Sequence, residues 1–132
     1  MERALKSAGL KPTDIDHINT HGTSTPAGDT SEVMAISKLF GDHVADMPIN
    51  SIKSMTGHLL GGSSAIEAVA TVLTLRDGII PPTINHFNDD PAIDPNIDIV
   101  YWEARKKDMT YAISNAFGFG GHNVSVIFKK YQ

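Results

Sequence analysis

Two hydrophobic periodicities run along the chain and predict alternating helices and strands. Apolar residues recur three and four positions apart in some segments, which is the spacing of a helix that buries one face. Shorter apolar runs are typical of strands. Two strand-loop-helix units followed by further strands indicate an α/β fold. The predicted helices cover 2–8, 29–40 and 63–77, and the predicted strands cover 15–19, 48–53, 97–102, 110–114 and 123–130.

The helix predicted at 63–77 has almost no polar face, so we expect most of its sides to be enclosed. Glu67 lies one turn inside this apolar segment, and a buried carboxylate is costly unless it is paired. We therefore expect Glu67 to have a cationic partner, which is either Lys53, a bound cation or a residue of another chain. The alternative is that the Glu67 side chain reaches a wet edge of the fold.

Composition limits the class of protein. The chain has 132 residues, of which 41% are hydrophobic and 20% charged, with a net charge of -4. These values indicate one globular domain over 1–132. The longest Lys/Arg run, 105–107, is interpreted as a solvated turn, which argues against nucleic acid as a partner. No apolar run reaches the roughly 18 residues that span a bilayer and no signal peptide opens the chain, so we expect no membrane contact and a cytoplasmic location.

Histidines follow the carboxyl ends of two predicted strands. His21 comes after 15–19 and His58 after 48–53. Ligands of α/β sheets collect beyond these ends, so we expect the two imidazoles to converge. A neutral pair could direct two N–H groups at one carbonyl oxygen and stabilise an enolate or a tetrahedral oxyanion. A zinc site would need a third ligand that nothing nearby supplies, and the remaining alternative is a hydrogen-bonded bystander histidine.

The other histidines and the glycine-rich run are assigned to structural positions. We expect His17 and His43 to be structural or exposed, and His86 to lie in the Pro-rich surface connection at 78–96. The run 115–122 predicts the tip of a hairpin. It is not a dinucleotide-binding fingerprint, because its spacing differs and a strand rather than a helix follows.

Three segments together resemble one enzyme family. They read His-Gly-Thr-Ser-Thr-Pro-Ala-Gly-Asp at 21–29, Ser-Ile-Lys-Ser-Met-Thr-Gly-His-Leu-Leu-Gly at 51–61 and Ser-Asn-Ala-Phe-Gly-Phe-Gly-Gly at 114–121. In order and spacing they are similar to the carboxyl-terminal half of the β-ketoacyl-acyl carrier protein synthases, in the stand-alone type II elongating form. The resemblance covers nearly the whole chain.

The resemblance implies a fold like that of thiolases. In that fold two similar halves, each a five-stranded mixed sheet with helices, stack as five layers αβαβα, and two subunits usually form a homodimer. This chain would be one such half. The apolar helix at 63–77 would then lie in the central layer, which would account for its missing polar face.

The resemblance also implies a decarboxylative Claisen condensation in fatty acid elongation. An acyl group is loaded on an active-site cysteine, malonyl-acyl carrier protein loses carbon dioxide, and the enolate attacks the acyl thioester. Both groups arrive on the phosphopantetheine arm of the acyl carrier protein. By this resemblance His21 and His58 would be catalytic and would hold the malonyl carbonyl and the enolate oxygen, and Lys53 would tune the neighbouring charge.

Further roles follow from the same resemblance. Phe119 would be the gate beside the acyl pocket, and its backbone N–H would belong to the oxyanion hole. Thr23 and Thr25 would hydrogen-bond the pantetheine arm, and Phe117 would also contact the substrate. The family uses no cofactor, although some members bind a structural monovalent cation. The positions that match that cation site are Asn19, Glu67, Ser114 and Asn115.

The chain also departs from the family pattern. It has no cysteine, so we expect the amino-terminal half with the catalytic cysteine to be absent and this fragment alone to be inactive. His122 stands where the family usually has Thr, and Gly-Gly-Ser-Ser at 61–64 replaces the commoner Gly-Ala-Ala-Gly. Two alternatives remain open. One is a non-catalytic thiolase-fold partner, such as a chain-length-determining subunit, and the other is a ketosynthase that decarboxylates malonyl groups without condensing them.

Overall fold

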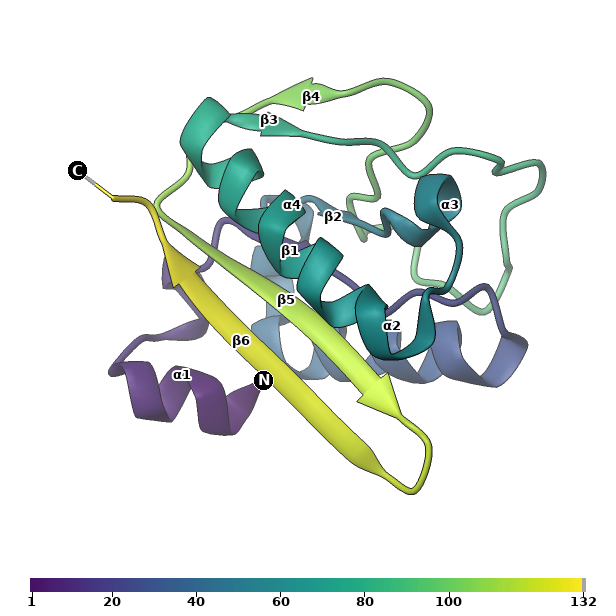
Figure 1. The fold of residues 1–132 in the computed structure, drawn as a ribbon, viewed down its shortest axis with the longest axis horizontal. Coiled ribbons are helices and arrows are strands. Elements are labelled where there is room, and N and C mark those ends of the chain that lie inside the picture. The colour runs from purple at the N-terminus through teal and green to yellow at the C-terminus, as the bar shows by residue number, and fades with distance from the viewer. Residues whose placement is uncertain (132) are drawn as a thin grey trace.

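The computed structural model describes residues 1–131 and contains the predicted alternation of helices and strands (Figure 1). The helices are α1 (Glu2–Ala8), α2 (Pro26–Phe40), α3 (Lys53–Thr56) and α4 (Ser63–Asp77). The strands are β1 (His17–Asn19), β2 (Ile49–Asn50), β3 (Ile79–Ile80), β4 (Arg105–Lys106), β5 (Tyr111–Gly118) and β6 (His122–Lys129). The α/β class and the helices predicted at 2–8 and 63–77 are confirmed.

A four-stranded mixed sheet forms the centre of the fold. Its order is β2-β1-β5-β6, in which β1 is parallel to both β2 and β5, and β5 is antiparallel to β6. β2 is shorter than the predicted 48–53 because the chain enters α3 at Lys53. The carboxyl ends of parallel strands share one edge of a sheet, so the loops that follow β1 and β2 are brought together.

The strand predicted at 97–102 is wrong. This segment reaches the sheet through an isolated bridge between Ile99 and Ile49, with two backbone hydrogen bonds of 2.8 and 2.9 Å on either side of it. The chain then turns away, because Trp102 has a positive φ of 62°. The five-stranded sheet that the resemblance implies is therefore represented here by four strands and one bridge.

α2 begins earlier than predicted. Its N-cap is Thr25 and its first residue is Pro26, whose fixed φ and missing N–H suit the first turn of a helix. The spacing of Asp29 and Glu32 would allow a capping box, but the helix starts at Pro26 and no such box forms. The carboxylates of Asp29 and Glu32 instead accept hydrogen bonds from the loop before the helix.

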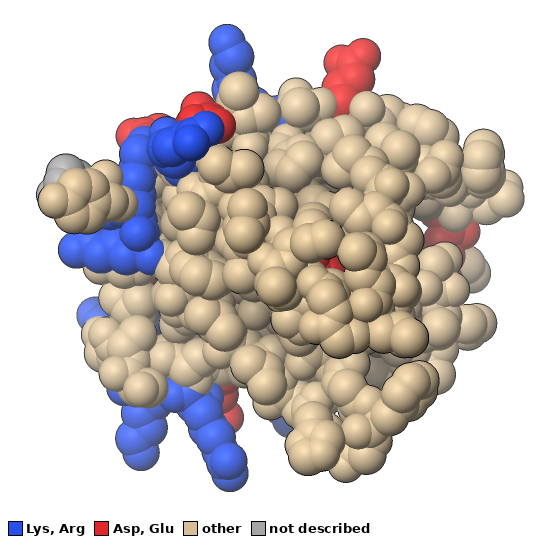
Figure 2. Space-filling model, viewed as in Figure 1, with Lys and Arg blue, Asp and Glu red and all other residues tan. Residues whose placement is uncertain are grey.

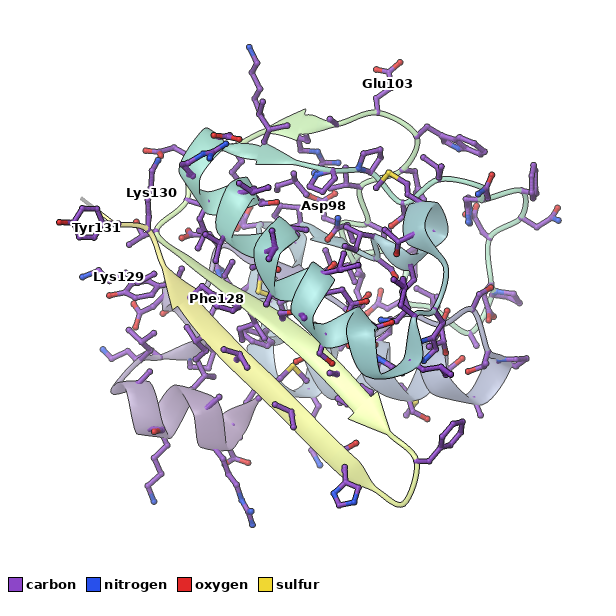
Figure 3. All side chains as sticks on the ribbon, in the orientation of Figure 1. Asp98, Glu103, Phe128, Lys129, Lys130 and Tyr131 are labelled. Atoms are coloured by element: carbon purple, nitrogen blue, oxygen red, sulfur yellow. The ribbon has the colours of Figure 1, made fainter. Side chains whose placement is uncertain are left out.

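The larger hydrophobic core lies between the sheet and α2. Ile18 of β1, Ile36 of α2 and Ile113 of β5 are fully buried within it. α4 covers the opposite face of the sheet, in front of β5 in Figure 1, with a smaller core beneath it that includes Leu75. Phe128 of β6, labelled in Figure 3, packs against this smaller core.

α4 is covered on one side only, contrary to the prediction that most of it is enclosed. The residues that it buries are mostly polar: Ser63, Glu67, Thr71, Thr74 and Leu75. Its exposed residues include large apolar ones: Ile66, Val69, Val72 and Leu73. Figure 2 shows that the face formed by α4 and its surroundings carries almost no charge, and that Lys and Arg gather toward the left and lower edges of the view. The missing polar face in the sequence thus corresponds to an uncovered apolar surface.

The connection between β3 and β4 contains two aromatic pairs. The His86 ring stacks on Tyr101 with centroids 4.0 Å apart, and its Nε2 lies 2.8 Å from a carboxylate oxygen of Asp89. Phe87 and Trp102 meet edge to face with centroids 6.2 Å apart, and both side chains are exposed. His86 therefore lies in the surface connection, as predicted, and its ring is held there by stacking on Tyr101.

Two other predicted loops can be compared with the structure. The solvated turn predicted at 105–107 is wrong, because Arg105 and Lys106 form strand β4, although both side chains are exposed. The glycine-rich run forms the predicted hairpin tip between β5 and β6, where Gly120 and Gly121 each have a φ of 83°. Within residues 1–131, every helix is too short or too polar to cross a membrane.

Candidate active site

Two histidine rings meet beyond the carboxyl ends of β1 and β2. The centroids of His21 and His58 lie 5.6 Å apart, and the ring planes are at 84° to each other. The ring of Phe117, near the end of β5, lies 5.3 Å from that of His21. The predicted convergence of the two imidazoles is confirmed, and the cluster contains one residue from each of the three sequence motifs.

His21 is uncharged at neutral pH. Burial of the ring lowers its pKa to about 4, and the nearby positive charge of Lys53 and the His58 ring act in the same direction. The Nδ1 atom of His21 is buried and has no hydrogen-bond partner within residues 1–131. A buried polar atom without a partner is costly, so the surroundings of this nitrogen leave one hydrogen bond unmet.

His58 is oriented by the start of α4. Its Nδ1 lies 3.0 Å from the Ser63 hydroxyl and 3.1 Å from the Leu60 backbone N–H, which donates to it. A backbone N–H can only donate, so Nδ1 of His58 is the acceptor and Nε2 carries the proton. Ser63 Oγ in turn accepts the Leu59 backbone N–H at 2.8 Å. The His58 ring can therefore present an N–H to a ligand from its other side.

Lys53 and Glu67 form a buried ion pair beside the rings. Their side chains are 4% and 2% exposed, which confirms that Glu67 has a cationic partner and identifies it as Lys53 among the three candidates. Burial raises the pKa of Glu67, and the hydrogen bond and charge of Lys53 oppose that rise. Glu67 Oε2 is buried without a hydrogen-bond partner in the described residues.

Three of the four residues implied for a monovalent cation have side chains that suit one. The Glu67 carboxylate has an unused buried oxygen. Asn19 and Ser114 also have side-chain oxygens, of which Asn19 Oδ1 accepts the Ile52 backbone N–H and Ser114 Oγ accepts the Asn19 amide, both at 3.5 Å. These oxygen donors fit a hard monovalent ion. The Asn115 side chain is engaged elsewhere, because its amide nitrogen donates to Glu32 and its amide oxygen accepts from Ser125.

Thr23 and Thr25 lie together at the start of α2, with their hydroxyl oxygens 3.3 Å apart. Between them Ser24 has a positive φ of 61°, and both carboxylate oxygens of Asp29 accept its backbone N–H at 3.1 Å. Gly28 is required by close approach, because a Cβ there would lie 2.4 Å from Thr25 Oγ1. The helix thus fixes the loop that precedes it.

A cavity of about 400 Å³ opens beside this loop. Its lining includes the two threonines, Ser51, Lys53 and Tyr101, whereas His21, His58 and Phe117 are not among the residues that line it. Phe119 is not part of this wall: it lies at the tip of the hairpin and is 96% exposed. The structure therefore brings His21, His58, Lys53 and Phe117 together and leaves Phe119 apart from them.

Residues 1–87 match a family model described as the C-terminal domain of beta-ketoacyl synthase. The chain belongs to the β-ketoacyl synthase family. It is 54% identical over 129 residues to a 3-oxoacyl-[acyl-carrier-protein] synthase 2 of Synechocystis, a match that covers 98% of this chain and 30% of the relative. It is 47% identical over 132 residues to the protein of the same name in Staphylococcus aureus, covering 100% of this chain and 31% of the relative.

Solved structures of ketosynthases have the same fold as this synthase domain. A beta-ketoacyl synthase from Burkholderia phymatum superimposes with a TM-score of 0.93 at 42% identity, covering 100% of this chain and 31% of that one. A type II polyketide ketosynthase in complex with its acyl-carrier protein superimposes with a TM-score of 0.94 at 33% identity, covering 99% and 32%. The thiolase-like fold is confirmed, and the domain spans about 30% of the length of its curated relatives.

The sequence reasoning missed three residues that shape the site of this synthase domain. Ser63 orients His58, Asp29 holds the threonine loop, and Glu32 binds the backbone beside His21. All three lie on a helix just after the loop that they contact. The signal that could have identified them is a polar or acidic residue in the first two turns of a helix that directly follows one of the histidine-containing segments. For Asp29 and Glu32 this signal is ambiguous, because their spacing also fits a capping box.

Proposed function

We propose that this chain is the carboxyl-terminal part of a type II 3-oxoacyl-acyl carrier protein synthase that elongates fatty acids by decarboxylative condensation. The observation that carries the proposal is the meeting of the His21 and His58 rings, 5.6 Å between centroids, with the pKa of His21 lowered to about 4. The relatives in Synechocystis and S. aureus, which have that name, support it.

Two neutral imidazoles suit the decarboxylation step. When the malonyl group loses carbon dioxide, the electron pair of the broken C–C bond moves into an enolate, and negative charge gathers on the thioester oxygen. N–H groups of His21 and His58 would stabilise that charge without the repulsion that a carboxylate would add. The enolate carbon would then attack an acyl-cysteine thioester, forming the new C–C bond as the thiolate leaves. The cysteine would come from a part of the protein outside these 132 residues.

Other residues would support binding. The Lys53 ammonium would keep the adjacent ring neutral and would favour the developing negative charge. Thr23 and Thr25 would hydrogen-bond the pantetheine arm beside the cavity, and Phe117 would contact the acyl or malonyl group. Phe119, exposed at the hairpin tip, would close the acyl pocket when the rest of the protein is present, and its backbone N–H would join the oxyanion hole.

The partners follow from the same proposal. The acyl carrier protein would deliver both thioesters, and the similar polyketide ketosynthase is described as being in complex with such a carrier. The whole synthase would act as a cytoplasmic homodimer. A structural monovalent cation would be held by Glu67, Asn19 and Ser114, where it would neutralise the unpaired carboxylate oxygen.

A chimeric synthase would test the proposal directly. In this protein, called the chimera below, the present chain replaces the matching segment of the Synechocystis relative. We expect the chimera to decarboxylate malonyl-acyl carrier protein and to condense it with an acyl primer. His21→Ala and His58→Ala should each lower the decarboxylation rate by about 10²-fold or more.

The matched control is His43→Gln. His43 lies away from the site, and its Nε2 donates a hydrogen bond to the Ile15 carbonyl. It should leave both activities intact. Decarboxylation without condensation would favour the decarboxylase alternative, and a chimera that performs neither step would favour the non-catalytic partner. If His58→Ala left decarboxylation unchanged, the role proposed for His58 would be wrong.

A further inference from the structure

Glu32 of α2 is a buried carboxylate whose two oxygens both bind the loop that carries His21. The residue is 4% exposed. Its Oε1 accepts the backbone N–H of His21 at 3.0 Å, and its Oε2 accepts the backbone N–H of Gly22 at 3.1 Å. The carboxylate therefore determines where the His21 backbone lies relative to α2.

The same carboxylate also contacts the strand on the other side of the site. Asn115 of β5 donates its side-chain amide to Glu32 Oε1 at 2.9 Å, and its amide oxygen accepts the Ser125 hydroxyl of β6 at 2.7 Å. Two positions further along β5, the Phe117 ring lies 5.3 Å from the His21 ring. Glu32 thus connects the loop of His21 to the hairpin that carries Phe117.

A carboxylate is the side chain that this position requires. Its three partners are all donors, and a carboxylate offers acceptors only, whereas a glutamine would turn an amide N–H against one of them. Within residues 1–131 the ion pairs do not include Glu32, so these three hydrogen bonds are what offset its burial. A group kept only for packing would not need a buried charge.

We propose that Glu32 is a positioning residue of the synthase: it holds the His21 backbone in the orientation that decarboxylation needs, and through Asn115 it keeps that loop in register with the hairpin of Phe117. The claim deepens the function proposed above and rests on it. Glu32 acts through His21, and its effect should therefore fall on the step that uses His21.

The test uses Glu32→Gln in the chimera, with Glu103→Gln as the matched control. Glu103 lies on the surface, and its labelled side chain points outward in Figure 3. Malonyl decarboxylation and transfer of an acyl group to the cysteine are assayed separately. Hydrogen exchange of the peptide that contains residues 20–25 is measured by mass spectrometry on the same samples. Asn115→Ala and the double variant complete a mutant cycle.

We expect Glu32→Gln to lower kcat for decarboxylation by about 10- to 100-fold, since displacing a catalytic group by about 1 Å has that effect. Acyl transfer should change less than about twofold, exchange within 20–25 should accelerate, and Glu103→Gln should match the unsubstituted chimera. The effects of Glu32→Gln and Asn115→Ala should be less than additive.

Two results would overturn the proposal. One is unchanged exchange within 20–25, and the other is a parallel loss of both activities, which would indicate a general structural role. A chimera without any activity would refute the proposed function instead, and the exchange measurement would still decide whether Glu32 holds the loop.

Discussion

The two strand-loop-helix units of this domain, β1 with α2 and β2 with α4, place similar groups in opposite surroundings. Each puts a histidine after its strand and a buried glutamate on its helix. In the first unit α2 turns Val33, Ile36 and Phe40 inward, and Glu32 binds the backbone beside His21. In the second unit α4 turns Glu67, its threonines and Leu75 inward, and Ile66, Val69, Val72 and Leu73 are exposed.

This difference shows which of the two units has its contacts supplied by this chain. The loop of His21 is held by hydrogen bonds from its own helix and from β5. The unit of His58 has a buried polar interior, but four large apolar residues on the outer face of α4 are exposed. The domain spans about 30% of its curated relatives, and the stacked halves of the thiolase-like fold would place further chain on that face.

Breaking the ion pair in the second unit should have the largest effect. Lys53→Met leaves the Glu67 carboxylate buried without its partner, and we expect the free energy of unfolding of the chimera to fall by about 3 to 5 kcal/mol in denaturant titrations. The double variant Lys53→Met/Glu67→Leu should regain most of this loss. A loss of about 1 kcal/mol or less for Lys53→Met would mean that the pair behaves as an exposed one.

Lowering the pH should reduce the free energy of unfolding through His17 of β1, in the first unit. This ring is fully buried with Nδ1 2.9 Å from the Pro48 carbonyl, and burial lowers its pKa from 6.5 to about 4 despite that hydrogen bond. The unfolded chain binds a proton below about pH 6.5 and the folded chain only near pH 4, so stability is lost as pH falls through this window. The full effect is about 3 kcal/mol. Urea titrations across the window should show a shallower pH slope for His17→Gln, with the remainder due partly to His21.

Removing the group that orients His58 should have a smaller effect. Ser63→Ala deprives the Leu59 N–H and His58 Nδ1 of a partner, and we expect about 1 kcal/mol less stability together with slower decarboxylation. The neighbouring exposed Ser64→Ala is the control. Equal rates for the two variants in the chimera would show that Ser63 does not position the ring.

The smallest effect should come from the outer face of α4. Val69 is 61% exposed, so Val69→Asp should change the stability of the chain by itself by about 0.5 kcal/mol or less. Val33 is 7% exposed in α2, and Val33→Asp should prevent folding. Circular dichroism during urea unfolding distinguishes the two. In the chimera Val69→Asp should be far more harmful, and equal tolerance in both proteins would mean that the face stays uncovered.

Local patterns in the sequence predicted much of the fold. Helix ends at Gly9, Gly41 and Gly78 followed from the residue type, and the structure places each of these glycines at a positive φ. The meeting of His21 and His58 followed from a rule about parallel strands, because that rule depends on topology rather than on side-chain detail. A cationic partner for Glu67 followed from the cost of burying one charge alone, and the structure identifies that partner as Lys53.

Other features depend on contacts that a pattern does not contain. The absence of a polar face on α4 indicates that it is enclosed in some assembly, but not which side this chain covers. The Thr71 hydroxyl is satisfied within its own helix, by the Glu67 carbonyl at 2.8 Å, so a polar residue could face inward. Glu32 has the spacing of a capping box, and only the fold shows that its partners are His21, Gly22 and Asn115.

The edge-to-face pair of Phe87 and Trp102 makes intrinsic tryptophan fluorescence a probe of this part of the domain. Trp102 is the single tryptophan of the sequence, and it directly follows Tyr101, which lines the cavity beside the threonine loop. The Trp102 side chain is 52% exposed and its indole meets the Phe87 ring edge to face, so its emission wavelength should respond when the surrounding connection moves. Fluorescence titration of unlabelled protein with pantetheine would therefore test whether that ligand, proposed above, enters the cavity.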